Sequence, residues 1–133
     1  MNIVFDTEVL LAYYLGEPAG KKVENLLRET MRRENTSYLN IGNLMELYYI
    51  LYRKSPDLAD DKEANLRGYG VEIVPVDDDA LWREAARIKA AHAISLADSL
   101  AAATAKMKKT RLLVGRDEES QGLDIAIEVE RIN

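Results

Sequence analysis

The chain has 133 residues, of which 47% are hydrophobic and 31% are charged, and this length and composition predict one domain spanning residues 1–133. It contains no cysteine and one histidine, so disulfide bonds, thiolate zinc sites and histidine-rich metal centres are excluded, and any bound metal must be held by oxygen. The formal net charge of −5 argues against a broad nucleic-acid-binding surface, although acids that surround a divalent cation make the loaded protein less negative.

The chain shows no segment suited to a membrane. No apolar run approaches the roughly 18 residues needed to span a bilayer. The first residues lack the basic start and the small-residue cleavage site of a signal peptide. We therefore expect a cytoplasmic protein that does not contact a membrane.

Strand-like and helix-like segments alternate along the first half of the chain. Gly16 and Pro18 end the first helix-like segment, and the second carries an apolar stripe at helical spacing that begins at Val23. Asn40 is placed to cap the third. The predicted elements are a strand at 2–5, helices at 8–15 and 19–33, a strand at 36–39, and helices at 41–53 and 57–67.

The second half continues the alternation. After Gly68 and Gly70 it predicts a strand at 71–76, a helix at 80–91, a helix that begins at 95, and strands at 111–114 and 125–132. The helix LADSLAAATAKM is apolar on nearly every side and is predicted to be buried. Alternating strands and helices imply right-handed crossovers, so we predict a three-layer α/β/α fold with a mostly parallel central sheet.

Four acidic residues lie at the end of a strand-like run or inside an apolar helix-like run, which are unusual places for solvated charge: Asp6, Glu46, Asp98 and Asp117. Burying a carboxylate is costly unless a cation compensates it. Asp6 and Asp117 follow strands, and parallel sheets bind ligands beyond the carboxyl ends of their strands. If the four acids converge, they suit Mg²⁺ or Mn²⁺, and a phosphodiester is the natural substrate.

Most of these acids also have a purely structural interpretation. Asp6 is a good helix cap, and Thr7 either shares that role or adds a hydroxyl beside the metal site. Asp98 follows Ser95 at the spacing of a capping box. Asp117 lies in a charged turn. Taken singly, none of these acids demands a metal.

The helix at 41–53 is ambiguous in a different way. Glu46 lies in its middle, where capping cannot explain it, and its structural alternative is a solvated stripe shared with Asn43 and Arg53. Tyr48, Tyr49 and Tyr52 are interpreted first as core residues, with a partner groove or a dimer face as the alternative.

Three segments together resemble a known family: IVFDTEVLLAYYLGEPAGKKVENLL, NIGNLMELYYIL and IKAAHAISLADSLAAATAK. They are similar to the PIN-domain nucleases, particularly the small VapC-type toxins of prokaryotic toxin–antitoxin pairs. The resemblance implies metal-dependent cleavage of RNA, with Asp6, Glu46, Asp98 and Asp117 as the catalytic and metal-binding residues. It also implies a homodimer and a cognate antitoxin that places a basic or aromatic segment near the acids.

The last motif of the resembled family differs in this chain. The family usually has Thr, a small or basic residue, Asp, two residues and Phe, whereas LLVGRDEES has Gly115 and Ser120 at the Thr and Phe positions. Both changes weaken the expected support of Asp117. The alternative function is therefore a catalytically weak PIN-fold module that binds RNA or a protein partner. A phosphoacceptor receiver domain shares the layout, but VEIVPVD and RLLVGR fit it poorly.

Overall fold

Parallel strands form the centre of the structure, a computed structural model that describes residues 2–115 and 129–132. Within these residues the sheet has five strands in the order β3-β2-β1-β4-β5, and every neighbouring pair is parallel. In chain order the elements are β1 (Ile3–Phe5), α1 (Thr7–Tyr14), α2 (Gly20–Met31), β2 (Ser37–Asn40), α3 (Ile41–Lys54), α4 (Pro56–Gly68), β3 (Glu72–Val74), α5 (Asp79–Ala91), α6 (Leu96–Lys108), β4 (Arg111–Val114) and β5 (Val129–Arg131).

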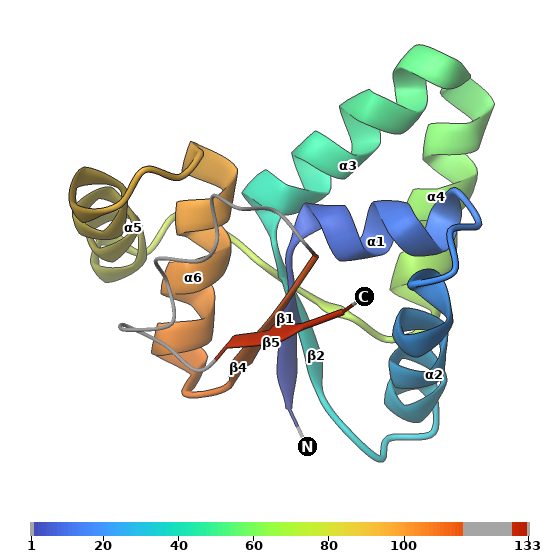
Figure 1. Ribbon diagram of the computed structural model, residues 1–133, viewed down its shortest axis with the longest axis horizontal. Helices are drawn as coiled ribbons and strands as arrows, with labels where there is room; N and C mark the ends of the chain where they lie inside the picture. Colours follow the sequence, from blue (N-terminus) through green and yellow to red (C-terminus); the bar gives the residue numbers. More distant parts are fainter. Residues whose placement is uncertain (1, 116–128, 133) are drawn as a thin grey trace.

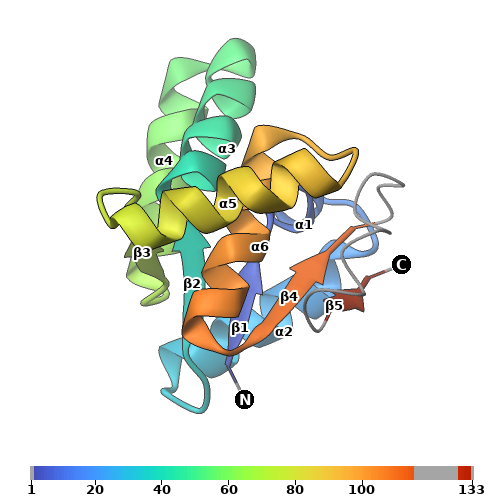
Figure 2. The ribbon, with the colours of Figure 1, turned by 90° about the vertical axis from the view of Figure 1, so that its left-hand side faces the viewer.

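Helices cover both faces of the sheet (Figure 1). Successive side chains of a strand point to opposite faces, so Ile3 and Phe5 of β1 contact one helical layer and Val4 contacts the other. The first layer contains α1, α2, α3 and α4, and the second contains α5 and α6, which lie in front of the sheet in Figure 2. The predicted three-layer α/β/α fold is thereby confirmed. No helix within the described residues is long and apolar enough to cross a membrane.

Helix α6 lies directly against the sheet because its side chains are small. Ala101, Ala102 and Ala103 are 0% exposed, which agrees with the predicted burial of this segment. The start of α3 also packs closely on α6, since a Cβ atom added to Gly42 comes within 2.5 Å of the Cδ1 atom of Leu100. The positions of α3 and α6 along the sheet are therefore fixed by close contact.

The observed boundaries differ from the predicted ones by a few residues, for local reasons. Helix α1 begins at Thr7 because Asp6 caps it. Helix α2 ends at Met31, and Arg33 then adopts a left-handed conformation with φ 61°. Strand β3 ends before Pro75, which has no N–H group to donate. Of the strand predicted at 125–132, residues 125–128 lie outside the described residues.

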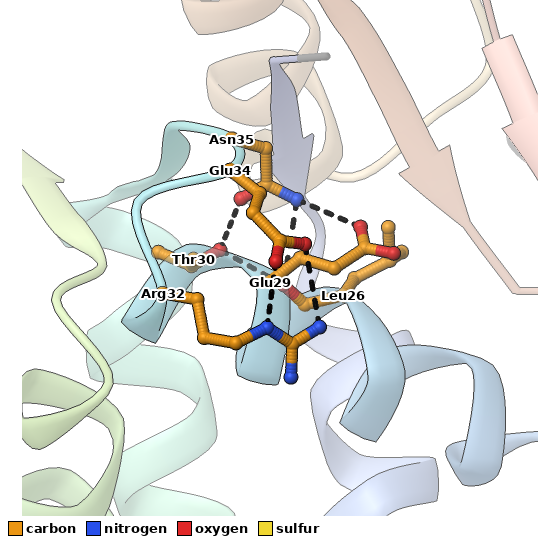
Figure 3. Close-up of polar contacts among 6 residues, drawn as sticks. All are labelled: Leu26, Glu29, Thr30, Arg32, Glu34 and Asn35. Atoms are coloured by element: carbon orange, nitrogen blue, oxygen red, sulfur yellow. Dashed lines mark hydrogen bonds and ion pairs between the residues drawn. The ribbon is translucent and has the colours of Figure 1, made fainter.

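A cluster of polar side chains holds the connection between α2 and β2 (Figure 3). The Oγ1 atom of Thr30 donates to the carbonyl oxygen of Leu26 at 2.9 Å and also bonds to the amide oxygen of Asn35. The Nδ2 atom of Asn35 donates to the Oε2 atom of Glu29 at 3.2 Å. The cluster is at the amino end of the sheet, so its role is to hold the turn that delivers β2 beside β1.

Asn40 joins three elements and provides a test of the fold. Its Oδ1 atom accepts from the N–H of Gly42 at 2.8 Å, which confirms the predicted cap, and its Nδ2 atom donates to the Oγ1 atom of Thr104 on α6 at 3.0 Å.

We expect Asn40→Ala to lower the free energy of unfolding by about 2 kcal/mol, because a cap and a buried hydrogen bond are lost. Urea denaturation measures the effect. Asn25→Ala, at an exposed position of α2, is the control and should change it by less than about 0.5 kcal/mol.

Candidate functional site

The carboxyl ends of three neighbouring strands meet at one edge of the sheet. Asp6 directly follows β1, Asn40 ends β2, and Gly115 directly follows β4. The backbone N–H of Asp6 donates to the carbonyl oxygen of Leu113 at 3.2 Å, so the chain leaving β1 stays attached to β4. Helices α1 and α3 begin at this edge, which is where a parallel sheet binds its ligands.

Asp6 is buried at this edge, with an exposed fraction of 3%. Its Oδ1 atom accepts a hydrogen bond from the N–H of Val9 at 3.1 Å and so caps α1. The capping interpretation is therefore correct. It is also compatible with cation binding, because a carboxylate has two oxygens and several lone pairs. The positive end of the helix dipole favours the negative charge at this position.

Asn43, which is fully buried on α3, connects the neighbours of two predicted ligands. Its Nδ2 atom donates to the carbonyl oxygen of Ala97 at 3.0 Å and to the Oγ1 atom of Thr7 at 3.3 Å. In return, the Oγ1 atom of Thr7 donates to the backbone oxygen of Asn43 at 3.2 Å. Thr7 follows Asp6 and Ala97 precedes Asp98, so one side chain brings the starts of α1 and α6 to α3.

The other two described acids lie beside this connection. Glu46 is three residues after Asn43, on the same face of α3, and is half-buried. The proposed solvated stripe is wrong for Asn43, which is buried and hydrogen-bonded. Asp98 is half-buried in the first turn of α6, and its N–H donates to the Oγ atom of Ser95 at 3.1 Å. The hydroxyl of the predicted capping box therefore caps α6.

The chemistry of these groups fits a hard divalent cation. The donors are carboxylate and amide oxygens, which Mg²⁺ and Mn²⁺ prefer. The Oδ1 atom of Asn43 is buried and has no hydrogen-bond partner among the described residues, so an acceptor oxygen stays unsatisfied at this junction. Within residues 2–115 and 129–132, however, no three His, Cys, Asp or Glu side chains are close enough to hold a metal. Asp117 lies outside those residues, so the ligand set remains a prediction.

A carboxylate that the sequence analysis did not assign to the site is found beside the end of β4. Glu8 follows Asp6 by two residues, and its side chain lies over Gly115. A Cβ atom added to Gly115 comes within 2.6 Å of the Cδ atom of Glu8. Both residues line a cavity of about 330 Å³ that also contains Glu17 and Ile132. The sequence contained one indication of this residue, because Glu8 is an acid in the first turn of the helix that starts at the carboxyl ends of the strands.

Three-layer α/β/α proteins with a parallel sheet bind their ligands at the carboxyl ends of the strands, and this chain carries acids there. Residues 3–124 match the family model of the PIN domain, so the chain belongs to the PIN domain family, whose members are generally nucleases. The predicted PIN family is thus confirmed. None of the curated proteins shows significant sequence similarity to this chain.

Solved structures of toxin–antitoxin complexes share the fold. VapBC2 from Rickettsia felis, bound to a promoter DNA fragment, is similar with a TM-score of 0.77 and 16% identity over 100% of both chains. DNA-bound VapBC from Salmonella typhimurium gives 0.74 and 15% over 98% of both. VapBC-5 from Mycobacterium tuberculosis gives 0.63 and 24% over 99% of this chain and 98% of that one. At these identities the similarity establishes the fold alone.

A substitution of Thr7 tests the contact between α1 and α3, and a substitution of Thr110 is its control. Thr7→Val removes a hydroxyl that both donates and accepts, and we expect it to lower the free energy of unfolding by about 1–2 kcal/mol. Thr110→Val is the matched control, because its buried Oγ1 atom has no partner in the described part of the chain. That substitution should cost less than about 0.5 kcal/mol or be stabilising. Equal losses in urea denaturation contradict the assigned role of Thr7.

Proposed function

We propose that this protein is a VapC-like toxin: a cytoplasmic endoribonuclease that hydrolyses RNA phosphodiester bonds with Mg²⁺ or Mn²⁺ held by Asp6, Glu46, Asp98 and Asp117. Membership of the PIN family supports the nuclease class. The observation that carries the proposal is the set of hydrogen bonds of Asn43, which joins the residues next to Asp6 and Asp98 at the ligand-binding edge.

The chain's own residues supply binding and orientation in this reaction. A divalent cation, when bound, supplies Lewis-acid activation of the phosphodiester and of the attacking water. The proposed ligands come from separate elements, and the buried contact between Thr7 and Asn43 limits their relative movement. Because Asp6 also caps α1, its carboxylate is oriented by the helix before any cation binds.

A cognate antitoxin is the proposed protein partner. The similar structures include VapBC complexes and a toxin–antitoxin complex from Klebsiella pneumoniae, which has a TM-score of 0.69 and 13% identity over 90% of this chain. We propose that the antitoxin places a basic or aromatic segment near the acids, because a cationic side chain there competes with the metal for the same carboxylates.

RNA cleavage tests the proposal directly. We expect the wild type to cleave structured RNA with Mg²⁺ or Mn²⁺ and to lose the activity in EDTA. Asp6→Asn and Asp98→Asn should lower the rate by at least roughly a hundredfold, since losing a direct ligand exceeds the 10–100-fold effect of losing an outer partner. Asparagine caps a helix as well as aspartate does, so Asp6→Asn retains the start of α1. Asp61→Asn, exposed on α4, is the control and should retain activity.

Metal-independent cleavage that survives both substitutions contradicts the nuclease proposal. The second candidate, a PIN-fold binding module that cleaves poorly, is favoured by Gly115 at the family's Thr position. Titration calorimetry with Mn²⁺ separates the two candidates. Uptake of the ion supports the enzyme, and RNA or partner binding without ion uptake supports the module.

We also propose that two copies of the chain associate through α3. This helix exposes apolar side chains along one stripe, and its neighbour α6 adds one more at its start: Ile41, Met45, Tyr49, Tyr52 and Leu96. Met45 is 68% exposed and Leu96 is 61% exposed. Tyr49 and Tyr52 are exposed as well, so their first interpretation as core residues is wrong. The guanidinium of Arg53 lies 4.9 Å from the centroid of the Tyr49 ring, so the uncharged part of the stripe is the end formed by Ile41, Met45 and Leu96, and we propose that this end contacts a second copy.

Sedimentation equilibrium checks the association. We expect the wild type to sediment as a dimer and Met45→Lys to shift it toward the monomer, because the substitution puts a charge into the apolar contact. Met31→Lys is the matched control, since Met31 is 56% exposed at the end of α2, away from the stripe. A monomeric wild type, or an unchanged mass for Met45→Lys, contradicts the proposed dimer face.

A further inference from the structure

The far end of α3 carries aromatic and cationic side chains that face water: Tyr49, Tyr52, Arg53 and Lys54. The guanidinium carbon of Arg53 lies 4.9 Å from the centroid of the Tyr49 ring. Neither Arg53 nor Lys54 forms an ion pair with any described residue. This aromatic–basic end of α3 therefore differs from the uncharged end that forms the proposed dimer contact.

The ring of Tyr52 is supported by its neighbour on the preceding turn. The ring centroids of Tyr48 and Tyr52 are 5.9 Å apart, with an angle of 30° between the ring planes. The hydroxyl of Tyr48 donates to the Oδ1 atom of Asp60 on α4 at 2.6 Å, which holds Tyr48 between the two helices. Because this support exists before any ligand binds, a ligand that stacks on Tyr52 loses less conformational entropy on binding.

Helix α3 leads from the ligand-binding edge to its aromatic–basic end. It begins directly after β2 and runs away from the sheet to the turn into α4 (Figure 1). Glu46, Tyr49 and Arg53 have the spacing i, i+3 and i+7, so they lie along one face of the helix. The helix rises by about 10 Å over these residues. An extended chain that passes Glu46 along this face therefore contacts Tyr49 and Arg53 next.

We propose that the aromatic–basic end of α3 binds single-stranded RNA, with unpaired bases stacked on Tyr49 and Tyr52 and phosphates held by Arg53 and Lys54. This surface takes the proposed RNA substrate as its ligand and so rests on the proposed function. Exposed aromatic rings beside cations suit a single strand, since every base has a flat face and every phosphate a negative charge. In a double helix the bases stack on one another and leave no face for the tyrosines.

Helix stability accounts for only part of this arrangement. Cations in the last turn favour the negative end of the helix dipole, and Arg53 stabilises α3 through its contact with Tyr49. Neither effect explains why two large aromatic rings stay exposed, since burial of such rings is strongly favourable. Stacking with a flat, partly apolar ligand does explain it.

Fluorescence anisotropy with a labelled single-stranded RNA of about twelve nucleotides, in EDTA to prevent cleavage, tests this surface in the full chain. Tyr49→Ala should weaken binding by about tenfold, and Tyr49→Phe should bind within about twofold of wild type, because stacking needs the ring and not the hydroxyl. Arg53→Ala should reduce the slope of log affinity against log salt by about 0.7, the value for one phosphate contact. A duplex of the same sequence should not respond to Tyr49→Ala.

Trp82→Ala is the matched control. Trp82 on α5 is 45% exposed, as Tyr49 is 43% exposed, and the guanidinium carbon of Arg83 lies 5.0 Å from the centroid of its ring. Residues 77–79 are all aspartate and lie just before this ring in the chain, where they disfavour phosphate. Trp82→Ala should therefore bind within about twofold of wild type. Sedimentation equilibrium should show the same mass for Tyr49→Ala as for wild type, which separates RNA binding from the proposed dimer contact.

The outcomes distinguish this surface from the proposed function. An affinity that Tyr49→Ala leaves unchanged, or an equal loss in Tyr49→Phe or Trp82→Ala, overturns the surface, while the cleavage assay still decides the nuclease. A wild type that binds no single-stranded RNA also overturns it. Binding that Tyr49→Ala weakens, in a chain that cleaves no RNA, supports the surface and the binding module and contradicts the enzyme.

Discussion

The geometry of the candidate site depends on one buried amide. Asn43 has no exposure to water, so its hydrogen bonds must be made within the protein, and they go to the starts of α1 and α6. Those two helices lie in different layers, and the sheet alone does not fix how their ends approach each other. A single polar group thereby links both sides of the sheet at the edge where the acids are found.

Two of the acids, Asp6 and Asp98, lie at the points where helices begin. Asp6 caps α1, and Ser95 caps α6 one turn before the side chain of Asp98 emerges. A capped helix start has a defined position and direction, and a carboxylate attached to it inherits both. The capping role of Asp6 is therefore compatible with the proposed metal-binding role of both acids.

Much of the fold can be predicted from the sequence because it depends on local patterns. The strand at 111–114, the cap at Asn40 and the buried alanine helix all follow from periodicity and capping, which involve residues close in sequence. The burial of Asn43 and the contact of Glu8 with Gly115 join residues far apart in the chain, so no local pattern reveals them. Tyr49 and Tyr52 look like core residues by type, and only the packing of α3 shows that they face outward.

The alanine surface of α6 has a consequence for how this protein can change. Because these side chains are small, the helix packs directly on the sheet, and a larger residue at Ala101, Ala102 or Ala103 must push the helix away. Asp98 is on the same rigid helix and moves with it. A larger residue in this part of the interior is thus expected to move Asp98, so the packing of α6 and the position of this acid are coupled.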